Sequence, residues 1–154
     1  MKLLNLLLLA LVAVLPLSCK GTGGGTSSSE IRSERIALKG ADSLTAEIIR
    51  GEWNENKLWL QVVFQNNGTE TVSFQLSQVF VDVNGTRLPA KPFLSSLEDD
   101  IDLLPSQVKT KKYGFHHRDL GIAGPTPGRH ELRVGGVRGG GMEGMELVVP
   151  FEVK

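Results

Sequence analysis

Three histidines are the side chains whose chemistry most directly suggests a metal site. His116 and His117 are adjacent, and neighbouring residues on a strand point to opposite faces, so this pair is poorly placed to hold one ion. His130 and Glu131 begin the zinc motif His-Glu-x-x-His, but Val134 stands where the second histidine is required. We therefore expect the histidines at the surface or at a strand edge, with copper or zinc binding by His117 and His130 as the alternative.

A group of carboxylates offers oxygen ligands to Ca²⁺. Its members are Glu98, Asp99, Asp100 and Asp102. The group lacks the alternating acidic register and the distal glutamate of an EF-hand loop. A solvated loop is the favoured interpretation, with Ca²⁺ binding as the alternative.

The segment Gly139–Gly144 matches the dinucleotide pattern G-x-G-x-x-G. That pattern binds a pyrophosphate only where a strand leads into the N-terminus of a helix. Here the residues that follow have the alternation of a strand, so we expect a flexible hairpin and no nucleotide.

Composition excludes several classes of function. The 154 residues carry 17 basic and 17 acidic side chains, and such a balance argues against nucleic-acid binding. One cysteine rules out an intramolecular disulfide and any multi-cysteine metal site. No G-x-S-x-G nucleophile elbow is present. We expect no catalytic residues, no cofactor and no enzymatic activity.

A local basic stretch allows two interpretations. It consists of Lys109, Lys111, Lys112 and Arg118. Lysines on an edge strand discourage pairing between molecules, which is sufficient reason for them. The alternative is contact with anionic lipid headgroups or a polyanionic polymer of the cell envelope.

The N-terminus carries an export signal. The apolar stretch Leu6–Leu15 is about ten residues long, too short for the roughly twenty that a membrane span needs, and Lys2 precedes it. With Ser18 before Cys19, the segment resembles a bacterial lipoprotein signal. That resemblance implies a signal peptide over residues 1–18 and lipid attachment at Cys19. Ordinary secretion with a free Cys19 thiol is the alternative.

A glycine- and serine-rich tether follows the cysteine. Residues 20–29 contain no apolar side chain and form a flexible coil next to the anchor. The resemblance to bacterial lipoproteins implies no retention in the inner membrane, because Lys20 follows the cysteine. We therefore expect a lipid-anchored protein of the bacterial envelope, at the outer membrane, with residues 19–29 as anchor and tether.

The remainder, residues 30–154, has the pattern of an all-β domain. Leu58–Gln65 alternates with period two, placing Trp59 and Val63 on the face opposite to Leu60 and Phe64. Asn-Gly turns follow at Asn67 and Asn84. Further strands are expected at 31–38, 44–50, 72–77, 79–84, 86–89, 108–117, 129–134 and 145–153.

About seven or eight short strands predict an antiparallel immunoglobulin-like sandwich. The connection between Pro92 and Gln107 is long enough to cross between sheets, and Ser95–Asp102 has the pattern of a short helical turn. Met145 should share the inner face of the last strand with Phe151. The packing residues expected to hold the sheets together are Leu60, Val62, Phe64, Val81 and Phe151.

Three segments, Leu58–Gly68, Leu104–Gln107 and Pro127–Val134, resemble bacterial immunoglobulin-like lipoprotein domains of unknown function. The same order is similar to that of the intracellular proteinase inhibitor family. The resemblance implies a sandwich, with proteinase inhibition through a loop as one activity.

We expect a membrane-anchored, non-enzymatic binding or structural module whose partner is another envelope protein. Loops carry function on such scaffolds, so Phe93–Leu104 and Ile122–Arg129 are the expected contact segments. Proteinase inhibition and metal binding in the periplasm are the alternatives.

Overall fold

The computed structural model describes residues 31–39, 41–54, 57–90, 100–116 and 124–154. Lipid attachment at Cys19 and the tether therefore lie outside the described residues. The described chain forms β-strands and one short 3₁₀ turn: β1 (Ile31–Ser33), β2 (Ile36–Leu38), β3 (Ala41–Trp53), β4 (Lys57–Asn66), β5 (Val72–Gln75), η1 (Leu76–Gln78), β6 (Val79–Val83), β7 (Thr86–Pro89), β8 (Asp100–Leu103), β9 (Val108–His116), β10 (Gly128–Val137) and β11 (Met145–Val153).

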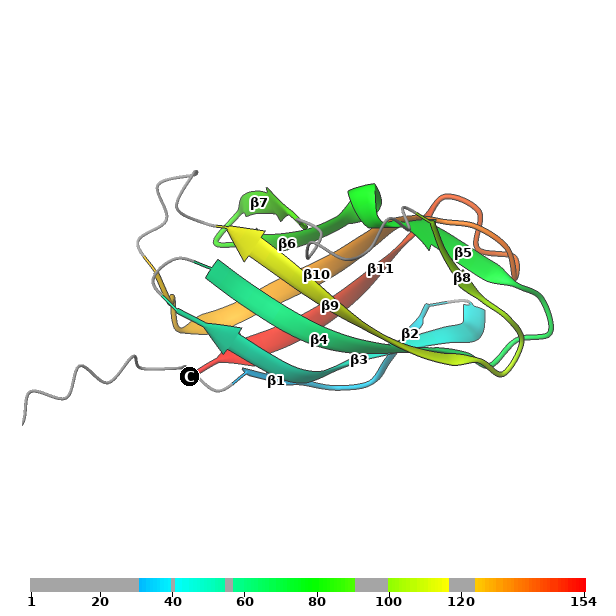
Figure 1. The fold of residues 1–154 in the computed structure, drawn as a ribbon, viewed down its shortest axis with the longest axis horizontal. Helices are drawn as coiled ribbons and strands as arrows, with labels where there is room; N and C mark the ends of the chain where they lie inside the picture. The colour runs from blue at the N-terminus through cyan, green and yellow to red at the C-terminus, as the bar shows by residue number, and fades with distance from the viewer. Residues whose placement is uncertain (1–30, 40, 55–56, 91–99, 117–123) are drawn as a thin grey trace, which may run out of the picture.

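Two sheets pack face to face, as Figure 1 shows. One has the order β1-β11-β10-β6-β7, the other β2-β3-β4-β9, and β5 pairs with β8 at one end. All these pairings are antiparallel. The order β3-β4-β9 against β11-β10-β6-β7 matches an immunoglobulin-type Greek key. The predicted all-β sandwich is confirmed. No helix in this described part is long and apolar enough to cross a membrane.

The structure has more strands than the seven or eight predicted. The N-terminal segment forms two of them, because β1 joins one sheet and β2 the other. The stretch Ser95–Asp102 was predicted to be a helical turn, and its described end is instead β8, paired with β5. The chain does cross between the sheets here, because β7 and β9 belong to different ones.

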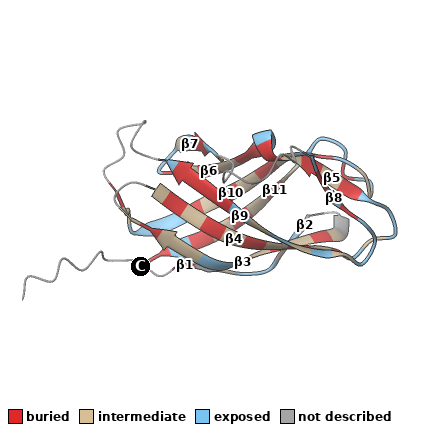
Figure 2. Ribbon diagram, viewed as in Figure 1, coloured by how far each residue is buried: buried red, intermediate tan, exposed pale blue. Residues whose placement is uncertain are grey.

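Strict alternation along β4 builds the core. Residues at every second position are buried and those between them are half-buried, so that red and tan alternate along this strand in Figure 2. Each buried Leu, Val or Phe side chain contributes about 1.5–3 kcal/mol. The predicted packing residues are all at most 2% exposed: Leu60, Val62, Phe64, Val81 and Phe151.

The strand β3 extends beyond its predicted end at Arg50 and contains a β-bulge. Ile48 pairs with Val62 and Arg50 pairs with Gln61, which leaves Ile49 as an extra residue. The extra residue shifts the alternation by one position, so that Ile48 and Trp53 are both buried although their numbers differ in parity. It also leaves Ile49 and Arg50 exposed side by side in the sequence.

The first strand joins the two sheets. The hydroxyl of Ser33 on β1 accepts a hydrogen bond from the backbone N–H of Ile48 on β3, at 2.8 Å. Ile31 packs over Gly51, where a Cβ atom would lie 2.7 Å from the Ile31 Cδ1 atom. The absence of a side chain at Gly51 therefore allows β1 to close this edge of the core.

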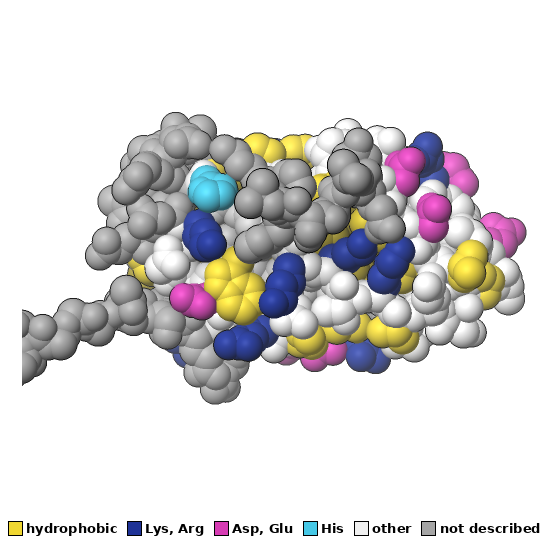
Figure 3. Space-filling view, viewed as in Figure 1, with side chains coloured by type: hydrophobic (Ala, Val, Ile, Leu, Met, Phe, Trp, Pro, Cys, Tyr) yellow, Lys and Arg dark blue, Asp and Glu magenta, His cyan; other side chains and the backbone are white. Residues whose placement is uncertain are grey.

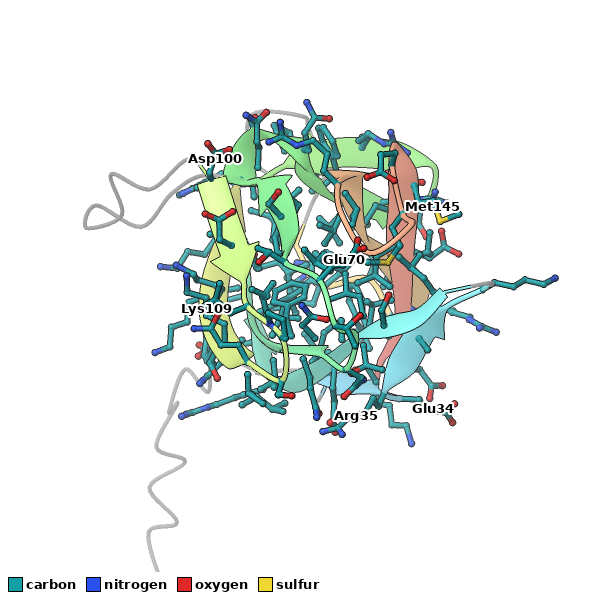
Figure 4. The ribbon with its side chains drawn as sticks, turned by 90° about the vertical axis from the view of Figure 1, so that its right-hand side faces the viewer. Glu34, Arg35, Glu70, Asp100, Lys109 and Met145 are labelled. Atoms are coloured by element: carbon teal, nitrogen blue, oxygen red, sulfur yellow. The ribbon has the colours of Figure 1, made fainter. Side chains whose placement is uncertain are left out.

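The end of the sandwich near β5 and β8 is held by polar contacts, of which those of Asn66 are buried or partly buried. Asn66 is fully buried, and its amide nitrogen donates to the carbonyls of Glu70 and Leu103 at 2.7 and 2.9 Å. Its Oδ1 atom accepts from the N–H of Gly68. Figure 4 looks onto this end, where the Glu70 carboxylate accepts from the N–H of Gly140 at 3.2 Å.

The glycine-rich segment Gly139–Gly144 connects two strands, as expected. Its flexibility stays a prediction, and the segment packs against the fold through Met142, which is fully buried and whose Sδ atom accepts a hydrogen bond from the Ser43 hydroxyl. Arg138 forms a bridge with Ser73 through two backbone hydrogen bonds. Met145, expected on the inner face, is instead 38% exposed at the start of β11.

Replacing Gly139 by alanine tests the packing of this turn. Gly139 has φ +84°, and an added Cβ atom would overlap the carbonyl oxygen of Thr71. We expect Gly139→Ala to lower the free energy of unfolding by about 3 kcal/mol. The control is Gly141→Ala, at φ +76° in open space, which should cost only about 1 kcal/mol. Equal losses in urea unfolding would show that the turn is not packed against β5.

Replacing Tyr113 tests whether its hydroxyl is buried in the core without a hydrogen bond. Its hydroxyl is buried without a hydrogen-bond partner among the described residues, and burial raises the pKa of this phenol above its ordinary value of 10.0. We expect Tyr113→Phe to raise the unfolding free energy by up to about 1 kcal/mol at pH 7. Above pH 10 only the unfolded state ionises, so wild type should lose about 1.4 kcal/mol per pH unit, and the variant should not.

This is the only tyrosine in the chain, so tyrosinate absorbance reports it without overlap from another tyrosine. Ionisation of the native protein near pH 10 would contradict the burial.

Candidate binding surface on the four-stranded sheet

Trp59 lies on the outer face of the β2-β3-β4-β9 sheet. It alternates with buried Leu58 and Leu60, so its ring is directed away from the core. Directly opposite it on β3, the Glu52 carboxylate accepts a hydrogen bond from the indole Nε1–H at 3.0 Å. A cross-strand pair of this kind fixes the orientation of the ring.

Two cations flank this ring. Arg50 and Lys112 lie opposite Gln61, one on each neighbouring strand. The Arg50 Cζ atom lies 5.5 Å from the indole centroid and the Lys112 Nζ atom 5.7 Å. Both distances are within the range of cation–π attraction, about 0.5–1 kcal/mol at exposed sites. We call Arg50, Glu52, Trp59 and Lys112 the Trp59 surface.

Neither flanking cation has a carboxylate within 4 Å in the described part of the chain. On the outer side, the strands β4 and β9 contribute Lys57 and Lys112 but no Asp or Glu. Figure 3 presents this face, on which hydrophobic side chains lie exposed among lysine and arginine side chains. The surface therefore carries positive charge that its described neighbours only partly balance.

Register divides the basic stretch into two parts. Lys109 and Lys111 lie opposite Phe64 and Val62, on the inner side of the last described strand of this sheet. Charged residues directed inward on such a strand discourage pairing between molecules. Lys112 points to the other face, beside Trp59. Lys109 and Lys111 therefore suit the interpretation as edge protection, and Lys112 suits the interpretation as a contact with an anionic surface. Arg118 lies outside the described residues.

The outer face of the other sheet is different, because the charged side chains around Arg133 form ion pairs with one another. Arg133 on β10 pairs with Asp82, Glu131 and Glu146 at 2.5–2.6 Å. Asp82 also accepts from Arg87 at 3.0 Å. The hydrogen bond from Arg87, together with the charges of Arg87 and Arg133, holds the pKa of Asp82 below its ordinary value although desolvation opposes this.

The histidines do not form a site in the described structure. His130 is 2% exposed, so its predicted place at the surface or a strand edge is wrong. Its ring packs between Trp53 and Phe151, at centroid distances of 5.3 and 5.7 Å, and Nε2 donates to the Thr126 carbonyl at 2.8 Å. His116 is exposed, as predicted.

Other candidates lie partly outside the described residues. His117, Glu98 and Asp99 are among these, as are residues 93–99 of the expected contact segment Phe93–Leu104 and residues 122–123 of the segment Ile122–Arg129. The Oδ1 atom of Asp100 lies 3.6 Å from the Nη2 atom of Arg138. Within the described ranges, no three His, Cys, Asp or Glu side chains are grouped as a metal site would require.

An open groove of about 770 Å³ lies near the C-terminus. Its lining mixes two acidic and two basic side chains with apolar ones: Ser33, Glu34, Arg129, Pro150, Phe151, Glu152 and Lys154. This balance gives the groove no charge preference, so the Trp59 surface is the stronger candidate.

The sequence analysis placed Trp59 on the outer face but did not identify it as a candidate. An outward tryptophan in a period-two strand is the signal that could have found it. Arg50 had no such signal, because only the bulge at Ile49 brings it to the ring.

Replacing Arg133 tests the charge network. Arg133→Met leaves three carboxylates without their shared cation, so we expect unfolding free energy to fall by about 1–2 kcal/mol at pH 7. Asp82 contributes stability above its ordinary pKa of 3.8, and this is lost as pH falls further. The difference from wild type should therefore shrink below pH 4. Arg129→Met is the control, and an equal loss there would refute the network.

The comparisons with known proteins show the fold. No family model and no curated protein matches the chain. A crystal structure of a functionally unknown protein from Listeria monocytogenes EGD-e is similar, with a TM-score of 0.53 and 13% identity. The match covers 86% of this chain and 89% of that one. At this identity the likeness shows a shared all-β architecture and nothing of activity.

Proposed function

We propose that the protein is a membrane-tethered, non-enzymatic binding module of the bacterial envelope, and that the Trp59 surface holds its partner. The observation that carries this proposal is the pair of cations beside an outward tryptophan, without carboxylate partners in the described chain. Burying such a surface against a complementary partner removes apolar area from water and satisfies both charges.

The charge contrast between the two faces supports the same choice of surface. The network around Arg133 already satisfies its charges internally, and breaking it for a partner would cost those ion pairs. Among the described residues, the Trp59 surface has no such pairs to break at Arg50 and Lys112. A partner therefore gains more from the four-stranded sheet.

Lipid attachment at Cys19 is part of the proposal. About ten tether residues have a root-mean-square span of roughly 20 Å, so the sandwich would stay close to the bilayer. The chain enters the fold at Ile31, which pairs with Val153, whereas β5 and β8 lie at the opposite end (Figure 1). This arrangement suits a module at the outer membrane that meets another envelope component. Proteinase inhibition through residues 93–104 or 122–129 stays a prediction.

Retention by the isolated envelope tests the binding role. Full-length wild type and Trp59→Ala, both in detergent, are mixed with immobilised envelope fragments from the source cells. We expect Trp59→Ala to lower the retained amount about tenfold, because the ring supplies much of the buried apolar area.

Phe80→Ala is the matched control. Phe80 is an outward aromatic on the other sheet with the Arg87 Cζ atom 5.3 Å from its centroid. It should be retained like wild type. Equal retention of all three proteins would refute the proposed surface, and an unmodified Cys19 thiol in the mass of the mature protein would refute the anchor.

A further inference from the structure

We infer that the partner of the Trp59 surface is an anionic glycan, whose sugar ring lies on the indole and whose acidic groups pair with Arg50 and Lys112. This inference rests on the proposed function and specifies the chemistry of its ligand. Three features of the surface lead to it.

The first feature is a fixed aromatic surface. The hydrogen bond to Glu52 holds the indole Nε1, so the ring keeps one orientation on the flat outer side of β4. A pyranose ring has one face of C–H groups, which packs on a flat aromatic surface and removes apolar area from water. An immobile ring also loses little conformational entropy when the sugar binds.

The second feature is the position of the cations. Arg50 and Lys112 come from strands on either side of Trp59, at 5.5 and 5.7 Å from its centroid. A guanidinium near an aromatic ring still has N–H groups to donate, and its planar fork matches a carboxylate, sulfate or phosphate. A sugar on the ring would thus have its acidic substituents within reach of two positive charges.

The third feature is the carboxylate of Glu52, which argues against a lipid bilayer as the partner. Inserting Trp59 among lipid headgroups would bring its hydrogen-bonded carboxylate to the same anionic surface, where like charges repel. Glu47 lies on the same face of β3, although Arg35 pairs with it at 3.3 Å. A glycan chain can align its charges with Arg50 and Lys112 and leave Glu52 beside a hydroxyl group.

Binding of polygalacturonate oligosaccharides tests the inference. The full-length protein in nonionic detergent is titrated with these uronic-acid oligosaccharides, with neutral dextran and with phosphatidylglycerol vesicles. Each titration is made at low and at high salt. We expect binding to polygalacturonate that weakens with salt, and dextran binding at least about tenfold weaker. Tryptophan fluorescence should change in wild type but not in Trp59→Ala, although buried Trp53 is still present.

The charge variants have a matched control. Arg50→Gln with Lys112→Gln removes two positive charges and should weaken polygalacturonate binding about tenfold or more. Arg129→Gln with Lys154→Gln removes the same charge from outside the Trp59 surface and should leave affinity within about twofold. Thermal unfolding of each variant verifies that the fold is intact.

Several results would overturn the inference. Equal weakening in both double variants would show non-specific charge attraction, and preferential binding of vesicles would identify a lipid surface instead. If no glycan binds while envelope retention still depends on Trp59, the glycan is wrong and the proposed function stands. If retention does not depend on Trp59, the proposed function itself fails.

Discussion

The alternation of buried and outward side chains along β4 is the constraint on which the rest of the structure depends. This strand lies between β3 and β9, so its inner residues must be covered by the opposing sheet. The requirement fixes the register of both neighbours, because a slip by one residue would exchange the core and solvent faces. The same register places Trp59 outward and aligns Arg50 and Lys112 on either side of Gln61. Core packing and the Trp59 surface are therefore two results of one pairing.

The two outer faces use charge in opposite ways. Around Arg133, the cations and carboxylates form ion pairs with one another, so these side chains already have charged partners. On the four-stranded sheet the Glu52 carboxylate accepts a hydrogen bond from the N–H of Trp59, so it orients the ring, and no ion pair joins it to Arg50 or Lys112 among the described residues. A chain with no net charge thus has one face on which Arg50 and Lys112 lie beside Trp59 without an ion pair to a described carboxylate.

Much of the fold could be predicted from the sequence, because period-two patterns and Asn-Gly turns are local signals. Apart from β8, the strands from Leu58 onward and the five packing residues followed from them. The bulge at Ile49 could not be predicted, since no residue type marks it and only pairing with β4 reveals it. Burial of His130 depends on Trp53 and Phe151, which are distant in sequence and meet only in the folded core. The candidate surface also depends on non-local contacts, the pairing of β4 with β3 and β9, so the sequence contained its residues but not their assembly.

The antiparallel pairing of β1 with the end of β11 has a mechanical consequence. Ile31 lies opposite Val153 and Ser33 opposite Phe151, so a pull on the preceding chain, directed away from the body, runs along the strand axis. Tension in that direction shears the interstrand hydrogen bonds together instead of unzipping them singly. Through the hydrogen bond that it accepts from the Ile48 N–H, the Ser33 hydroxyl transfers part of this force to β3 in the other sheet. A short strand at the point of entry thus distributes an external force over both halves of the domain.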